Sequence, residues 1–175
     1  MAKIVCKTPT LSYEQAPFPD VRIRAKPFRV DVQTLRIVEH VHGHGGWLTA
    51  VALVHPAIVL RRNRGGAWAV GLSTTLVTVV AGLGVWLYGF YTDQLKRSIF
   101  QTAPRFGWLF ERKEHLAFAA VMFAWLGAAA YIAAWKTEGT DRTYRTLAHR
   151  AYVIAAGIAI AVAALGTAVG TYKTF

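Results

Sequence analysis

Four long apolar runs constrain the fold of this chain more than any other feature of its sequence. They cover about residues 44–60, 67–91, 116–135 and 151–169, and none contains an aspartate, glutamate, lysine or arginine. A bilayer core about 30 Å thick needs about 20 apolar residues of helix to cross it. The sequence therefore predicts an all-α fold, a four-helix transmembrane bundle that contacts the lipid bilayer.

The first part of the chain has a different composition. Residues 1–41 are polar, basic and interrupted by prolines, so we expect an extended N-terminal arm followed by a four-helix domain over residues 42–175. The arm would lie along a partner subunit or the membrane surface, and disorder is the alternative. Residues 32–41 could form an interfacial helix that enters the first span. The 92–114 connection mixes aromatic and basic residues, which suits a segment in the headgroup plane.

The charge of the chain indicates a membrane surface and not a nucleic acid. The net charge is +11, but the basic residues lie in the arm and the loops, and no nucleic-acid-binding motif accompanies them. The arm, the 92–114 connection and the C-terminus hold 13 of the 20 lysines and arginines. Because basic residues concentrate on the cytoplasmic side of membrane proteins, we expect both termini in the cytoplasm.

Several residues within the predicted spans bear on packing. Pro56 interrupts the first span, which is tolerated where neighbours satisfy the carbonyl that it frees. Gly166 and Gly170 lie four apart in an alanine-rich span, so the fourth helix is expected inside the bundle, although such pairs also occur by chance. The hydroxyls of the second span could bind a quinone headgroup or a haem edge, but bonds to backbone carbonyls or a neighbouring helix are favoured. These hydroxyls belong to Ser73, Thr74, Thr75 and Thr78.

Histidines supply the candidate site, because ionisable residues in or beside membrane spans are functional candidates by default. His44 and His55 are 11 residues apart, which is three helical turns plus about 20°, so both project from one face about 16 Å apart. His115 opens the third span on the side of His44. His149 precedes the fourth span on the side of His55. The sequence thus predicts two facing pairs, His44 with His115 and His55 with His149.

Two imidazoles that face each other across a helical bundle can hold a haem iron between them. The propionates of a haem need cationic partners, for which arginine is well suited. The candidates are Arg61, Arg62, Arg105, Arg112 and Arg150. The His55–His149 pair is less level than the other, with a predicted offset of order 10 Å, because His149 lies outside its own span. One haem or two are therefore both open.

This arrangement resembles the membrane cytochromes b, in which histidines on a four-helix bundle carry haem. The resemblance is architectural, covers about residues 44–170 and rests on the four spans with His44, His55, His115 and His149. It implies haem b, with its iron ligated by these histidines, and electron transfer within a respiratory or photosynthetic complex, with quinone as a candidate partner. Because the chain has no flavin, nucleotide or iron–sulfur motif, other membrane subunits and a separate redox partner would complete the pathway.

Other functions stay open at this stage. The chain could be a non-catalytic accessory subunit of a larger membrane complex, and a stand-alone enzyme is less expected than either role. His40, His42 and His44 could instead bind zinc or copper as a surface cluster. A transporter is disfavoured because the spans hold no acidic residue. The single cysteine, Cys6, allows no disulfide within the chain, and the absence of Cys-x-x-Cys-His excludes covalent haem.

Overall fold

The computed structural model describes residues 31–62, 66–92, 96–136 and 141–170, and these residues are helical almost throughout. Most of the predicted N-terminal arm, residues 1–30, lies outside them. The helices are α1 (Val32–Arg61), α2 (Ala67–Tyr91), α3 (Arg97–Thr102), α4 (Pro104–Lys136) and α5 (Asp141–Gly170). All but α3 are long and apolar enough to cross a membrane. The predicted all-α fold with four long apolar helices is therefore confirmed.

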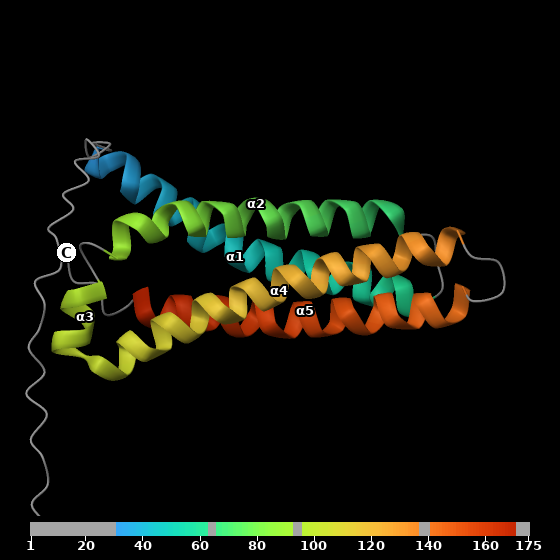
Figure 1. Ribbon diagram of the computed structural model, residues 1–175. Coiled ribbons are helices and arrows are strands. Elements are labelled where there is room, and N and C mark those ends of the chain that lie inside the picture. The colour runs from blue at the N-terminus through green and yellow to red at the C-terminus, as the bar shows by residue number, and fades with distance from the viewer. Residues whose placement is uncertain (1–30, 63–65, 93–95, 137–140, 171–175) are drawn as a thin grey trace, which may run out of the picture.

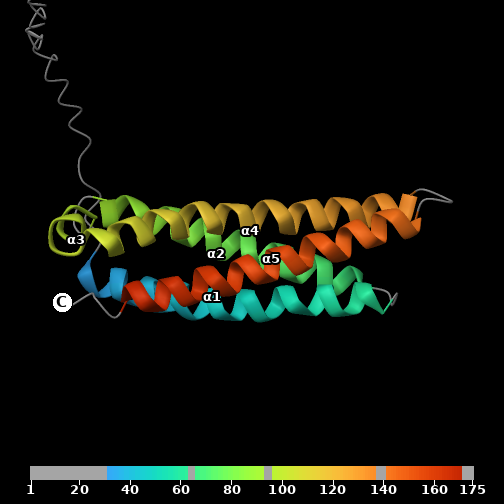
Figure 2. The same cartoon turned by 90° about the horizontal axis from the view of Figure 1, so that it is seen from below.

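The four long helices form an elongated bundle in which consecutive helices run in opposite directions (Figures 1 and 2). α1 packs against α2 and α5, and α4 packs against the same two helices, so α1 and α4 lie diagonally across the bundle. α3 lies at one end and contacts α4. The start of α1 and the end of α5 lie at that same end (Figure 1). This placement agrees with the expectation that the first, middle and last polar segments share one side.

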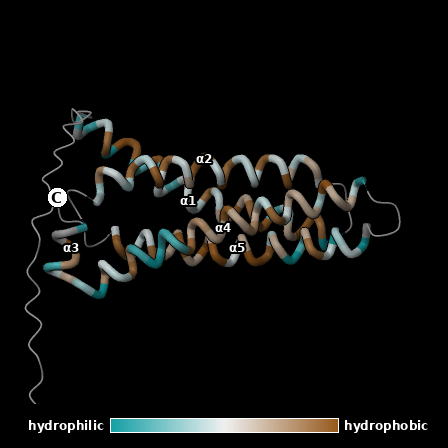
Figure 3. The backbone as a smooth tube through the Cα atoms, viewed as in Figure 1, coloured by the Kyte–Doolittle hydropathy of each residue, from teal (hydrophilic) through white to brown (hydrophobic). Residues whose placement is uncertain are grey.

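Three of the long helices extend beyond the apolar runs that predicted them. α2 has the predicted bounds, whereas α1 begins at Val32, α4 at Pro104 and α5 at Asp141. The polar approach to the first span is thus continuous with α1. Much of the predicted headgroup segment also belongs to α4. Hydrophilic residues gather toward the two ends of the bundle (Figure 3), because the helical backbone continues where the apolar composition stops.

Small residues form most of the interior. Tyr152 is the largest fully buried side chain, at 0% exposure. It lies against Gly127 of α4, where an added Cβ would come within 2.8 Å of the tyrosine ring. Around it, alanines bring α4 and α5 together. The buried alanines of these two helices are Ala120, Ala124, Ala128, Ala130, Ala134, Ala148, Ala151, Ala155, Ala156 and Ala159.

The glycine pair of α5 does not make the close helix contact that its spacing suggested. An added Cβ at Gly166 would meet only Lys113 at 3.8 Å, which is ordinary contact, and one at Gly170 would meet nothing within 4 Å. The expectation that this helix lies inside the bundle is not confirmed, because 22% of its apolar window is buried, the lowest share of the four spans. It nevertheless packs closely against α4. Its alanines fill the interface, and Gly127 on the facing helix supplies the space.

Hydroxyl groups of α2 connect that helix to the other three long helices. Ser73 donates to the carbonyl of Ala52 on α1 at 2.7 Å. The hydroxyls of Thr74 and Tyr152 of α5 share a hydrogen bond of 2.7 Å. The indole of Trp125 on α4 donates to Thr78 at 3.1 Å. We call these residues of α2, Ser73, Thr74 and Thr78, the hydroxyl ladder.

Candidate functional site

His42 and His44 of α1 differ in exposure and in the backbone carbonyl that each contacts. His44 is exposed, and its Nδ1 lies 2.9 Å from the carbonyl oxygen of His40 one turn earlier. His42 is half-buried, with its Nδ1 3.1 Å from the carbonyl oxygen of Val80 on α2. Its ring occupies a notch at Gly84, where an added Cβ would come within 2.8 Å. The predicted haem pairs did not include His42, and the spacing of the histidines gives no sign of its contact with α2.

The histidines of α4 and α5 also have their Nδ1 atoms at backbone carbonyls. His115 is exposed, with Nδ1 2.9 Å from the carbonyl oxygen of Glu111 in its own helix. His149 is half-buried, with Nδ1 2.9 Å from the carbonyl oxygen of Ala57 on α1. A carbonyl oxygen only accepts hydrogen bonds, so each neutral ring carries its proton on Nδ1 and leaves Nε2 with its lone pair.

Neither predicted histidine pair forms an enclosed site in the described part of the chain. His44 and His115 are both exposed and lie on the diagonal helices α1 and α4. His55 is exposed as well, so three of the four predicted ligands face away from the buried core. No described ring contact joins the members of either pair. The interior that would have to hold a haem is filled by alanines and Tyr152.

The expected offset of the second pair is not observed. The imidazole of His149 reaches the carbonyl of Ala57, two residues after His55 along α1. The predicted offset of about 10 Å assumed that His149 lies before the start of the fourth helix. In the structure α5 begins eight residues before His149, at Asp141. His149 and His55 are therefore near the same level of the bundle, although His55 is turned outward.

A non-haem metal cluster is not formed by the described residues. No group of three or more histidine, cysteine, aspartate or glutamate side chains converges on a common point within the ranges that the structure covers. His40 and His44 share one side of α1, with ring centroids 6.5 Å apart. His42 turns toward α2 instead, so the three alternating histidines do not act as one set.

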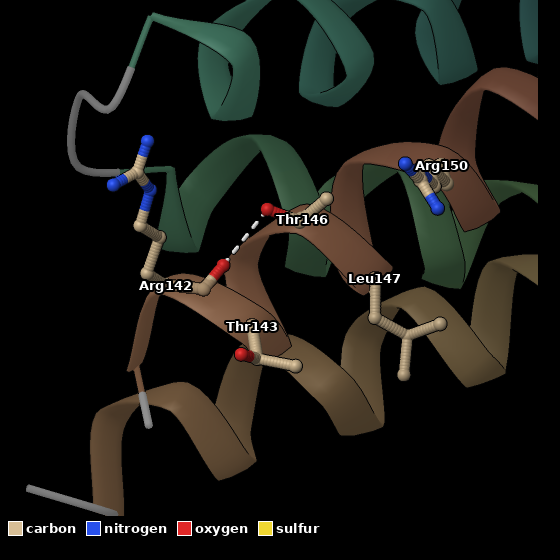
Figure 4. A pocket seen from close by; sticks show the side chains of 5 residues that line it. All are labelled: Arg142, Thr143, Thr146, Leu147 and Arg150. Carbon is tan, nitrogen blue, oxygen red and sulfur yellow. Dashed lines mark hydrogen bonds between the residues drawn. The ribbon is translucent and has the colours of Figure 1, made fainter. Parts of the chain in front are cut away.

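The predicted propionate partners lie at the two ends of the bundle. Arg61 and Arg62 are exposed at the end of α1. Arg105 and Arg112 line a shallow hollow of about 510 Å³ on α4, together with Trp108 and Leu109. At the other end, Arg150 lines a second hollow of about 440 Å³ on α5 (Figure 4). Its remaining lining residues are Arg142, Thr143, Thr146 and Leu147.

An ion pair connects the region before α3 to α4. The Lys96 ammonium lies 2.7 Å from a carboxylate oxygen of Glu111, and it also approaches the Tyr88 hydroxyl at 3.5 Å. The hydrogen bond to Glu111 raises the pKa of the Lys96 amine, because it stabilises the charged form. Lys96 therefore keeps its charge, and the α3 end of the bundle carries a fixed cation.

Comparison of the chain with protein-family models, with curated proteins and with solved structures finds no match in any of the three.

Proposed function

We propose that this chain is a multi-pass integral membrane protein that serves as a non-catalytic helical subunit of a larger membrane assembly. Four helices have the length and apolar composition to cross the bilayer. Large apolar and aromatic side chains cover the outside of the bundle, as contact with lipid or neighbouring helices requires. They include Trp68, Val85, Phe118 and Trp135, which are 68–91% exposed.

The closed interior is the observation that supports a structural role. Alanines fill the space between the helices, and interior hydroxyls are used to connect helix to helix. An interior of this kind offers no chamber for a substrate or a large cofactor. The basic, proline-containing sequence of residues 1–31, which precedes α1, gives the chain a polar segment for contact with partners.

Extraction from native membranes tests both parts of this proposal. We expect the protein to stay in the membrane fraction after alkaline carbonate washing and to migrate in mild detergent as a complex well above its own 19.3 kDa. Loss of the protein to the carbonate supernatant would contradict the membrane assignment. Migration as a single 19.3 kDa chain in every mild detergent would contradict the subunit role.

Electron transfer through b haem is a second candidate, and the orientation of the imidazoles favours it. Four histidines place Nδ1 at a backbone carbonyl, an arrangement that fixes the ring and its tautomer, as in metal-ligating histidines. Such residues do not enclose a haem within this bundle. A peripheral haem against exposed His44 or His115 would need a partner subunit on its other face, and its chemistry would be electron transfer.

A reduced-minus-oxidised absorbance spectrum with pyridine haemochrome quantitation decides between the two candidates. A b-type α-band from natively extracted protein would favour electron transfer. In that case either His44→Ala or His115→Ala should remove the band, while His40→Ala, an exposed imidazole one turn from His44 and outside both predicted pairs, should retain it. A featureless spectrum from an intact complex would leave the structural subunit as the function.

A further inference from the structure

Two arginine pairs repeat one arrangement at opposite ends of the bundle. The α4 pair, Arg105 and Arg112, is seven residues apart and flanks Trp108 and Leu109. The α5 pair, Arg142 and Arg150, is eight residues apart and flanks Thr146 and Leu147, as Figure 4 shows along α5. In each pair about two helical turns separate the arginines, and the residues between them that line the hollow are Trp108 and Leu109 on α4 and Thr143, Thr146 and Leu147 on α5.

The guanidinium groups of the α4 pair are accessible to a ligand. Arg105 and Arg112 are exposed, and the ion pair described for this part of the chain involves Lys96 and Glu111 instead. Trp108 beside them is 58% exposed and packs edge-on against Phe100 of α3, with ring centroids 5.9 Å apart. A fixed exposed indole between two guanidinium groups is typical of the membrane–water interface, where one end of the site is apolar and the other is wet.

The spacing between the two pairs matches a bilayer. The contacts of Gly127 with Tyr152 and of Gly166 with Lys113 give the antiparallel register of α4 and α5. By this register Arg150 is level with about residue 129 of α4, so it lies about 26 Å along the axis from Arg112. The outer arginines, Arg105 and Arg142, are about 48 Å apart by the same measure. The hydrocarbon core is about 30 Å thick and the whole bilayer about 40–45 Å, so the two pairs bracket its two headgroup layers.

We infer that each arginine pair is a binding site for the headgroup phosphate of an anionic phospholipid, one in each leaflet. Guanidinium groups present forked donors that match phosphate oxygens, and they attract anionic lipid over zwitterionic lipid through their net charge. Trp108 and Leu109 in one site, and Leu147 in the other, contact the first segments of the acyl chains. This inference rests on the membrane assignment proposed above and adds to it the class of ligand and the residues that bind it.

Native mass spectrometry of the detergent-purified full chain tests the inference with phosphatidylglycerol and phosphatidylcholine as probes. We expect tighter retention of phosphatidylglycerol by the unsubstituted protein. Arg105→Gln/Arg112→Gln and Arg142→Gln/Arg150→Gln should each remove one retained lipid, with affinity at that site falling about thirtyfold for two lost cations. Arg36→Gln/Arg61→Gln removes the same charge from exposed positions that line neither hollow and should keep both lipids.

Three results would overturn the inference. One is equal retention of the two lipids, and another is equal loss in the control variant. The third is displacement of phosphatidylglycerol by inorganic phosphate at millimolar concentration, which would assign the sites to free phosphate. Flotation of the same preparations with liposomes distinguishes failure of the proposed arginine sites from failure of the membrane assignment. If the variants float but keep both lipids, only the arginine sites are wrong, whereas an unsubstituted protein that does not float contradicts the membrane assignment itself.

Discussion

At the scale of single residues, Tyr152 and Gly127 decide how closely α4 and α5 approach. The tyrosine ring is fully buried and lies where a side chain at residue 127 would otherwise point. The sequence showed one alanine-rich span, the fourth, and the Gly166–Gly170 spacing predicted that this helix lies inside the bundle. It did not show that Gly127, and not the Gly166–Gly170 pair, faces a ring, because spacing alone does not reveal which residue stands opposite a glycine.

The substitution Gly127→Ala should destabilise the bundle. A methyl group 2.8 Å from the Tyr152 ring forces the helices or the ring to move, at a cost of about 1–3 kcal/mol, against a gain of under about 1 kcal/mol from helix propensity. Thermal unfolding in detergent, followed by circular dichroism, measures the difference. Gly157→Ala on α5 is the matched control, because its added Cβ meets nothing within 4 Å and it should unfold no earlier than the original protein. Equal unfolding temperatures for the two variants would contradict this account.

The hydrogen bond between Tyr152 and Thr74 should be measurable as a coupling energy. Both hydroxyls are buried and 2.7 Å apart. In a double-mutant cycle, Tyr152→Phe and Thr74→Val should each lower the free energy of unfolding, and their combination should cost less than the sum. The expected coupling is about 0.6 kcal/mol and at most about 1.7 kcal/mol, as for other hydrogen bonds between membrane helices. Strict additivity would mean that the hydroxyls contribute independently.

At the scale of elements, the apolar runs predicted every long helix and its C-terminal end to within one residue, but the start of α2 alone. The separate prediction of a helix over residues 32–41 agrees with the start of α1 at Val32. The predicted and observed bounds of α2 agree, because a glycine-rich turn precedes this helix and polar residues follow it. Its apolar run and its helix therefore coincide. α4 continues outward through twelve further residues, from Pro104 to His115, because charged side chains at a helix end reach water without breaking the backbone hydrogen bonds. Hydrophobicity therefore located the apolar part of each helix and not its full length.

The contact between α1 and α2 depends on Pro56 and the hydroxyl of Ser73. Proline has no backbone N–H, so residue 56 cannot donate to the carbonyl of Ala52, and Ser73 donates to that carbonyl instead. Ser73→Ala should lower the free energy of unfolding by about 1 kcal/mol, because a part-buried carbonyl loses its partner. In a Pro56→Ala background the restored N–H occupies the carbonyl, so the same substitution should cost much less. Chemical unfolding of the original protein, the two single variants and the double variant gives the four free energies of unfolding. An equal loss of stability from Ser73→Ala in both backgrounds would contradict the idea that Ser73 replaces the missing N–H of Pro56.

At the scale of the whole molecule, the sequence predicted which segments share an end and did not predict what the histidines meet. Helical phase relates residues along one helix, but the facing partner depends on how each helix is rotated within the bundle. That rotation places His44 and His115 on exposed faces of diagonal helices and turns His42 and His149 toward neighbouring backbones. Rotation follows from the packing of alanines, Gly127 and the hydroxyl ladder, which no single span reveals.

The topology of the bundle yields a last prediction, made with single cysteines in a Cys6→Ala background. The start of α1 and α3 lie at one end of the bundle, and the end of α1 and the start of α5 lie at the other (Figure 1). A membrane-impermeant maleimide should therefore label Arg36→Cys and Thr102→Cys from one side of the membrane, and Arg62→Cys and Thr143→Cys from the opposite side. All four positions are exposed, so reactivity reports sidedness and not burial.

The side that holds residues 36 and 102 should be the cytoplasm. The N-terminal arm, the 92–114 connection and the C-terminus, which are expected on that side, carry 13 of the 20 basic residues, and such residues are retained on the cytoplasmic side during insertion. Vesicles of both orientations distinguish the outcomes. Labelling of residues 36 and 102 from opposite sides would contradict a four-span bundle, whereas joint labelling from outside the cell would keep the bundle and reverse its orientation. In the second case the arginines of the 61–66 loop would outweigh the larger number of charges at the other end, because charges close to a short span have the stronger effect on insertion.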